Sequence, residues 1–147
     1  MPDIFFEDFA AGQEYELGSR TLDRAAIIEF ATEHDPQLIH VDEDAASQSI
    51  YGGLIASGWQ TCTLYMRLLC DNLLLRVDGM GSPGVDELRW LAPVRPGDTL
   101  SAKLRIEDVR ASKSKPDRGI VMTVGEVRNQ DGELVLTLKS ALMVRRR

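Results

Sequence analysis

The residues Gly52-Gly53-Leu54-Ile55-Ala56-Ser57-Gly58 lead directly into a long apolar run from Trp59 to Val77. The glycine pair favours a flexible turn. The run after it places apolar residues at helical spacing, at positions 59, 62, 65, 66, 69, 70, 73 and 74. We therefore expect a helix that begins between Leu54 and Gly58 and ends near Val77. Because its apolar face is broad, this helix must be largely buried, against a sheet or a second subunit.

The part of the chain after this helix has the alternation of β-strands. In the segment from Thr99 to Val109, every second residue from Leu100 to Ile106 is apolar, while charged residues such as Lys103 and Arg105 occupy the other face. An Asp-Gly pair at 131–132 marks a hairpin turn. The strands expected from these signals cover residues 13–22, 85–91, 99–109, 119–128 and 133–144. One long helix with successive hairpins predicts an α+β fold, a curved antiparallel sheet wrapped around a central helix, in a single domain over residues 1–147.

Shorter helices are expected upstream of the central one. Asp23 is a good N-cap for a helix over residues 24–33, and Pro36 disfavours a helical Asp35, so this helix should end near His34. The other expected elements are an arm over residues 1–13 with a Phe5, Phe6 and Phe9 anchor, an irregular or extended piece over 38–41, and a short helix from Asp42 through Ser47.

Composition excludes some classes of protein. The formal net charge of −6 argues against general nucleic-acid binding, although it leaves room for a local basic pocket that holds a phosphorylated cofactor. The acidic N-terminal residues lack signal-peptide features, and charged residues interrupt the longest apolar run, so we expect a cytoplasmic protein without a membrane span. Cys62 and Cys70 would be separated by about 12 Å of helix rise, too far for a disulfide, and are expected to be reduced.

Asp35 and His40 are the first candidates for chemistry. They lie five residues apart in a loop between two expected helices. A carboxylate and an imidazole so placed can bind and polarise one water molecule, and histidine exchanges protons near neutral pH. The alternative, a helix-terminating aspartate beside a surface histidine, remains open on residue types alone.

The glycines before the long helix are the second candidate. A helix N-terminus offers unpaired N–H groups, and glycine at Gly52, Gly53 or Gly58 lets a ligand approach them closely. Aimed at a carbonyl, such an N–H stabilises a developing oxyanion. The alternative is a plain loop-to-helix junction.

Other residue patterns carry weaker signals. Cys62 is expected to be a buried structural thiol, and Ser57 is not at nucleophile-elbow spacing. No zinc-ligand, phosphate-loop or dinucleotide pattern occurs. The basic loop with Lys113, Lys115 and Arg118 suits a solvated hairpin tip. A minority interpretation has this loop, or residues 145–147, meet cofactor phosphates.

Together these segments resemble the MaoC-like acyl dehydratases, the (R)-specific enoyl-CoA hydratase group of the hotdog fold. The resemblance covers nearly the whole chain. Its motifs are Asp35-Pro36-Gln37-Leu38-Ile39-His40-Val41-Asp42 and the helix start Ile55-Ala56-Ser57-Gly58, with Gly58 eighteen residues after His40. The segment from Leu88 to Leu100 resembles a strand-turn-strand unit common to many hotdog proteins.

The resemblance implies reversible hydration of a trans-2-enoyl thioester to an (R)-3-hydroxyacyl thioester. Asp35 and His40 would be the catalytic pair, and Gly58, Ser57 and Gly53 would form the oxyanion and substrate-binding site. It further implies no metal or redox cofactor, a substrate carried on coenzyme A or an acyl carrier protein, and a homodimer or higher homo-oligomer.

The chain departs from the family pattern at two places. Gln37 and Leu38 stand where many members have Asn and Pro. Some hydratases also have a Ser in the long helix that supports the catalytic Asp, and counting from Gly58 places Met66 there, unless Thr61 or Thr63 supplies the support. Two alternative functions therefore accompany the hydratase: an acyl-CoA thioesterase of the same fold, and a non-catalytic module that binds acyl thioesters.

Overall fold

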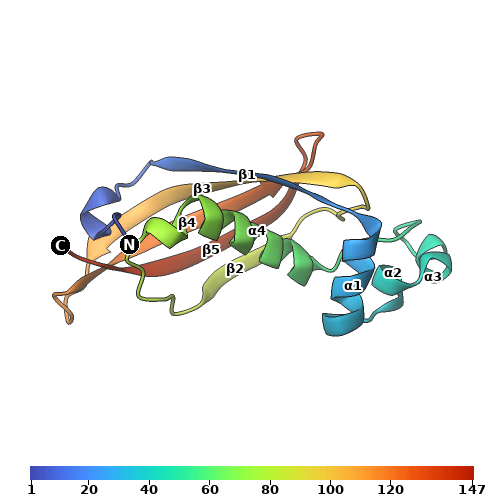
Figure 1. Cartoon of the computed structure of the whole chain (residues 1–147), viewed down its shortest axis with the longest axis horizontal. Coiled ribbons are helices and arrows are strands. Elements are labelled where there is room, and N and C mark those ends of the chain that lie inside the picture. The colour runs from blue at the N-terminus through green and yellow to red at the C-terminus, as the bar shows by residue number, and fades with distance from the viewer.

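A computed structural model describes every residue from Met1 to Arg147. Five antiparallel strands form one curved sheet in the order β1-β3-β4-β5-β2, and helix α4 lies across one face of it (Figure 1). The strands are β1 (Glu14–Leu22), β2 (Val85–Trp90), β3 (Asp98–Ala111), β4 (Arg118–Arg128) and β5 (Leu134–Arg145). The helices are α1 (Arg24–His34), α2 (Leu38–Val41), α3 (Glu43–Ser47) and α4 (Gly58–Asn72), with 3₁₀ turns η1 (Phe6–Asp8) and η2 (Leu74–Arg76). The expected α+β hotdog architecture is confirmed.

The core lies between the sheet and α4. Leu100, Leu104 and Ile106 of β3 are fully buried at alternate positions, as the sequence pattern predicts. Gly125 of β4 allows the helix to come close, because a Cβ atom at this position would lie 2.2 Å from the Tyr65 hydroxyl. A glycine at the middle of β4 therefore fixes how tightly the sheet wraps around the helix.

The central helix differs from the expectation in its end and in its buried face. It ends at Asn72 rather than near Val77, because the Asn72 side-chain amide donates to the carbonyl oxygens of Leu17 (2.6 Å) and Leu68 (2.9 Å) and closes the last turn. The expected face was also wrong in part, since Trp59 and Met66 are 56% and 46% exposed. The residues that the helix buries are Gln60, Thr61, Leu64, Tyr65, Leu68 and Leu69.

The segment after Pro36 also differs from the expectation. Residues Leu38–Val41 form one helical turn, α2, where an irregular or extended piece was expected. The β-branched residues Ile39 and Val41 favour an extended chain, but the His40 N–H donates to the Gln37 carbonyl oxygen and starts a turn. This turn directs His40 into the protein interior.

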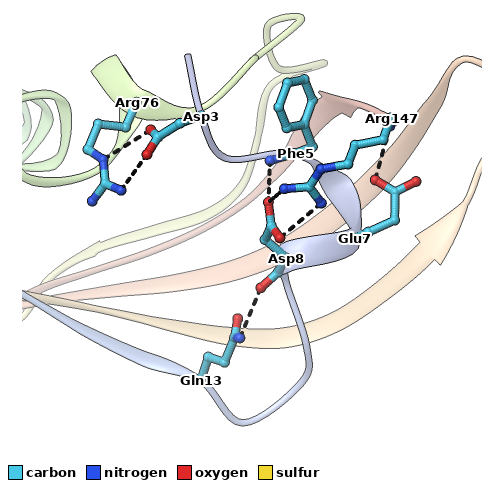
Figure 2. A network of polar contacts seen from close by, with 7 residues as sticks. All are labelled: Asp3, Phe5, Glu7, Asp8, Gln13, Arg76 and Arg147. Carbon is cyan, nitrogen blue, oxygen red and sulfur yellow. Dashed lines mark hydrogen bonds and ion pairs between the residues drawn. The ribbon is translucent and has the colours of Figure 1, made fainter. Parts of the chain in front are cut away.

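The two chain ends meet at the end of the sheet opposite α1–α3 (Figure 1). The expected aromatic arm is present, with Phe9 buried. Figure 2 shows Arg147 in an ion pair with Asp8 (2.8 Å), and its guanidinium lies 4.9 Å from the Phe5 ring centroid. The same figure shows the ion pair of Arg76 with Asp3 (2.7 Å).

The other C-terminal arginines are paired as well, Arg145 with Asp78 and Arg146 with Glu7. The structure therefore gives no support to the interpretation that residues 145–147 meet cofactor phosphates, since carboxylates already occupy all three guanidinium groups. None of the helices has the length and apolar character needed to cross a lipid bilayer.

Candidate active site

Asp35 is held at the end of α1 by two donors. Pro36 stops the helix at His34, as expected, and Asp35 takes non-helical backbone angles. Its Oδ1 accepts a hydrogen bond from the Gln37 amide at 2.7 Å, and its Oδ2 accepts one from the Ser57 hydroxyl at 2.7 Å. These two hydrogen bonds, with Gln37 the stronger cause, hold the Asp35 pKa below its ordinary value despite partial burial. Asp35 is therefore a carboxylate at neutral pH.

His40 faces Asp35 from the buried side. Its side chain is 6% exposed, and its Nε2 lies 3.4 Å from Asp35 Oδ2. Its Nδ1 lies 2.8 Å from the Ile55 carbonyl oxygen, and because a carbonyl only accepts, Nδ1 must carry the hydrogen. In the neutral imidazole the lone pair is then on Nε2, on the side of Asp35. The backbone N–H of Ile55 also donates to the Ile39 carbonyl, so α2 is fastened to the loop before α4.

Ser57 connects the two candidate motifs of the sequence. It is the fully buried N-cap of α4, where its Oγ accepts from the Trp59 N–H at 3.3 Å while its hydroxyl donates to Asp35. A hydroxyl can do both at once. The support for Asp35 that was sought at Met66, Thr61 or Thr63 thus comes from Ser57, one residue before the helix begins.

Gly58 provides a free donor at the start of α4. No group of the chain accepts a hydrogen bond from its backbone N–H. The indole of Trp90 packs directly on its Cα side, where a Cβ atom would lie 2.4 Å from the ring. Trp90 in turn meets the ring of Trp59 edge to face at 5.0 Å. The free N–H therefore lies beside an aromatic wall.

These groups share one cavity of about 440 Å³. Asp35, Gln37, His40 and Gly58 line it together with mainly apolar residues, which are Ile39, Tyr51, Ala56, Trp59, Thr61, Trp90, Leu91, Ala92, Pro93, Val94 and Val135. A mainly apolar wall with a few polar groups on one side suits a ligand with an apolar chain and one polar, reactive end.

One expected site residue, Gly53, lies elsewhere. Gly53 does not reach this cavity and lines a second hollow with Arg24 and Arg95. Met66 is exposed and is not part of the cavity wall. Cys62 contacts the Trp90 indole, and burial raises the pKa of its thiol, which agrees with a structural cysteine.

Sequence reasoning missed what Gln37, Ser57 and Trp90 do. Gln37 was noted only as a departure from a family pattern. Ser57 carried a usable signal, since serine just before a helix start is a preferred N-cap, and its position fixes the start of α4 at Gly58. No local signal marks the contact between Trp90 and Gly58, because it joins a strand to a helix more than thirty residues away in the chain.

Gln37→Ala is expected to raise the Asp35 pKa toward its ordinary value of 3.8, because the Gln37 amide contributes most to lowering it. A lowered carboxyl pKa stabilises the fold above the unfolded-state pKa, and this stability is lost as the pH falls through the folded-state pKa. The variant should therefore be less stable than the native protein at neutral pH, and the difference should vanish in acid. A ¹³C NMR titration of Asp35 measures the shift, with Gln48→Ala, another exposed amide, as the control. An Asp35 titration that Gln37→Ala leaves unchanged contradicts this explanation.

The chain is similar in sequence and in fold to known proteins. The family profile described as MaoC like domain matches residues 8–128. The crystal structure of the MaoC-like dehydratase from Rhodospirillum rubrum is 40% identical, covers 99% of both chains and superposes with a TM-score of 0.89. A Bacillus subtilis (strain 168) relative, the uncharacterized protein YdeM, is 29% identical over 90% of this chain and 97% of its own length. The (R)-specific enoyl-CoA hydratase of Rhodospirillum rubrum is 32% identical over 69% of each chain.

Proposed function

The chain belongs to the MaoC-like domain family, and from that premise we propose that it catalyses the reversible hydration of a trans-2-enoyl thioester to an (R)-3-hydroxyacyl thioester. The observation that carries the proposal is the grouping of Asp35, His40 and the free Gly58 N–H in one mainly apolar cavity. The enoyl chain would lie against the apolar wall, with its thioester carbonyl at Gly58 and its double bond between Gly58 and His40.

His40 is the proposed base. With Nδ1–H bound to Ile55, the Nε2 lone pair can accept a proton from a water molecule that Asp35 also holds. As the O–H bond breaks, the water oxygen bonds to C3 of the enoyl group, and the electrons of the C2=C3 double bond move toward the thioester carbonyl. The imidazolium then returns the proton to C2 on the same face, so one group serves both transfers. The Asp35 carboxylate stabilises the imidazolium while it exists.

The thioester oxygen gains negative charge in this step, and the Gly58 N–H at the start of α4 is the proposed donor to it. Only a donor that binds more strongly in the transition state raises the rate, and a fixed N–H beside an apolar wall does so. Ser57 serves as a positioning residue for Asp35 rather than as a second oxyanion donor. No step requires a metal or redox cofactor; coenzyme A or an acyl carrier protein would carry the acyl group.

The reaction is tested with crotonyl-CoA and longer enoyl-CoAs. Hydration removes the conjugated double bond and lowers the enoyl thioester absorbance. A thiol reagent in parallel assays detects free coenzyme A, which hydration does not release and a thioesterase does. Loss of absorbance without thiol release supports the proposal. Thiol release, or tight binding without turnover at every chain length, would favour one of the two alternative functions.

We further propose that a second copy of this chain covers the β2 edge of the sheet. β2 pairs only with β5, and it exposes Val85 and Trp90, followed by Leu91, alongside the charged residues Asp86 and Arg89. The opposite edge, β1, exposes only polar residues and glycine, since its apolar residues Leu17 and Leu22 are buried. An unpaired edge strand with exposed apolar residues at both of its ends, beside the cavity, suits a two-fold interface in which both copies use the same surface.

Val85→Lys is expected to turn the assembly into a monomer, because it buries a charge in an apolar interface. Size-exclusion chromatography with light scattering should give twice the chain mass for the native protein and the chain mass for the variant. Leu75→Lys, at a more exposed leucine on η2, is the matched control and should remain a dimer. A native protein with the mass of one chain contradicts this part of the proposal.

A further inference from the structure

A second hollow, of about 420 Å³, has a different character from the cavity. Three of the six residues around it are charged; the six are Arg24, Glu43, Gly53, Leu54, Arg95 and Pro96. The same two segments build both sites, because Ala56 and Val94 line the cavity and the Ala56 N–H donates to the Val94 carbonyl oxygen at 2.9 Å. The cavity and the hollow are therefore built on neighbouring residues of the same two segments.

The hollow contains a cationic side chain without a carboxylate partner. Arg95 is partly buried and forms no ion pair within the chain. Asp98, the acidic residue nearest in sequence, uses Oδ2 to accept from the Arg95 backbone N–H and Oδ1 to accept from the Gln130 amide, both at 2.9 Å. The guanidinium itself lies beside Gly53, with Nη1 3.7 Å from the position of a Cβ atom there.

The backbone adds further donors. The N–H groups of Gly53 and Leu54 donate to no acceptor of the chain, although Leu54 is buried. Arg24 brings a second guanidinium, which forms an ion pair with Glu43, so the charged groups of the hollow are net positive. Unpaired main-chain N–H groups beside a guanidinium are the donors that bind phosphate oxygens in proteins.

We propose that this hollow binds a phosphate group of the thioester's carrier, with Arg95 as the main contact. The inference rests on the proposed function, which places the thioester carbonyl at Gly58. A pantetheine arm separates that carbonyl from the nearest phosphate of either coenzyme A or a carrier protein, so the phosphate needs a second site. Gly53 lies five residues before Gly58, a span of at most about 18 Å when extended.

The proposed phosphate site is this hollow, and not the basic loop that the sequence suggested for cofactor phosphates. Lys113 and Lys115 lie at the tip of the hairpin between β3 and β4, at the same end of the molecule as the two termini (Figure 1). The cavity lies toward the other end, where α2 meets the start of α4. Gly53 was expected to bind substrate. In this proposal it does so by contacting the carrier of the thioester rather than the acyl group.

The test compares three crotonyl thioesters: crotonyl-pantetheine, which has no phosphate, crotonyl-phosphopantetheine and crotonyl-CoA. Arg95→Gln is expected to raise KM for a phosphorylated thioester about ten-fold, as loss of one charge-assisted hydrogen bond would. KM for crotonyl-pantetheine should not change. Lys113→Gln removes the same charge from the distant hairpin and should leave all three values unchanged, while Arg95→Lys should recover part of the loss.

Each result has a definite meaning. A rise for both phosphorylated thioesters supports the proposal and assigns the phosphate next to pantetheine, which carrier proteins share. A rise for crotonyl-CoA alone supports it and assigns a nucleotide phosphate. An equal rise for all three thioesters, or no rise, overturns it while leaving hydration itself intact.

A protein that hydrates none of the three thioesters overturns the proposed function instead. Titration calorimetry with coenzyme A then tests the hollow alone. A Kd about ten-fold weaker for Arg95→Gln than for the native protein supports phosphate binding, and equal values or no binding to either protein reject it.

Discussion

His40→Gln is expected to lower the rate of crotonyl-CoA hydration by about a thousand-fold or more, and Asp35→Asn by a similar factor, because general acid-base groups each contribute about 10²–10⁴. Gln at position 40 can still donate an amide hydrogen to the Ile55 carbonyl, so the α2 turn should persist, but it cannot take a proton from water. Asn at position 35 keeps the shape of the side chain and removes the charge that stabilises the imidazolium.

The controls use residues of the same types outside the cavity. His34→Gln changes the only other histidine, which is exposed at the end of α1, and Asp44→Asn changes an exposed aspartate on α3. Both should keep the native rate. Single-turnover absorbance measurements with matched thermal unfolding curves distinguish lost chemistry from lost fold. Native rates in both His40→Gln and Asp35→Asn would remove the proposed acid-base pair.

Gly58→Ala is expected to lower kcat by about 10²-fold or more, comparable to the loss of an oxyanion donor. A Cβ atom at this position would lie 2.4 Å from Cε2 and 2.5 Å from Nε1 of Trp90, so either the indole or the start of α4 must move. A shift of the helix start moves the N–H away from the thioester oxygen. KM should change less than kcat, because the other apolar residues of the cavity still bind the acyl chain.

A second substitution separates the clash from the loss of glycine itself. Trp90→Leu makes room for the new methyl group, so the double variant should recover part of the kcat that Gly58→Ala loses, relative to Trp90→Leu alone. Gly79→Ala is the matched control, because a Cβ atom there meets nothing within 4 Å, and its kcat should be native. A native kcat in Gly58→Ala would show that the N–H at position 58 does not need its present geometry.

The fold was predictable because its signals are local. The alternation in β3, the Asp-Gly turn before β5 and the cap at Asp23 each depend on a few consecutive residues, and the structure confirms the corresponding elements. The end of α4 was not predictable in the same way. Apolar spacing continues to Leu74, but Asn72 ends the helix through a hydrogen bond to Leu17, a contact that joins two distant parts of the chain.

The candidate site likewise has a part that local sequence signals predict and a part that depends on long-range contacts. Asp35 and His40 are five residues apart, so a single loop brings them together and spacing could identify them. The hydrogen bond that supports Asp35 comes from Ser57, which is twenty-two residues away in the sequence. Counting along the helix pointed to Met66 instead. The basic hollow was harder still, since its guanidinium groups come from α1 and from the turn before β3, and no motif connects Arg24 with Arg95.

The meeting of the chain ends has a practical consequence. Arg147 forms an ion pair with Asp8 of η1 (Figure 2), at the opposite end of the molecule from α1 and α2, which position Asp35 and His40 (Figure 1). A short linker could therefore join the termini, and new ends could be opened in the exposed hairpin at residues 113–117, giving a circular permutant in which the proposed catalytic groups are undisturbed. For the same reason, attachment to a solid support through either terminus would leave the cavity facing the solution.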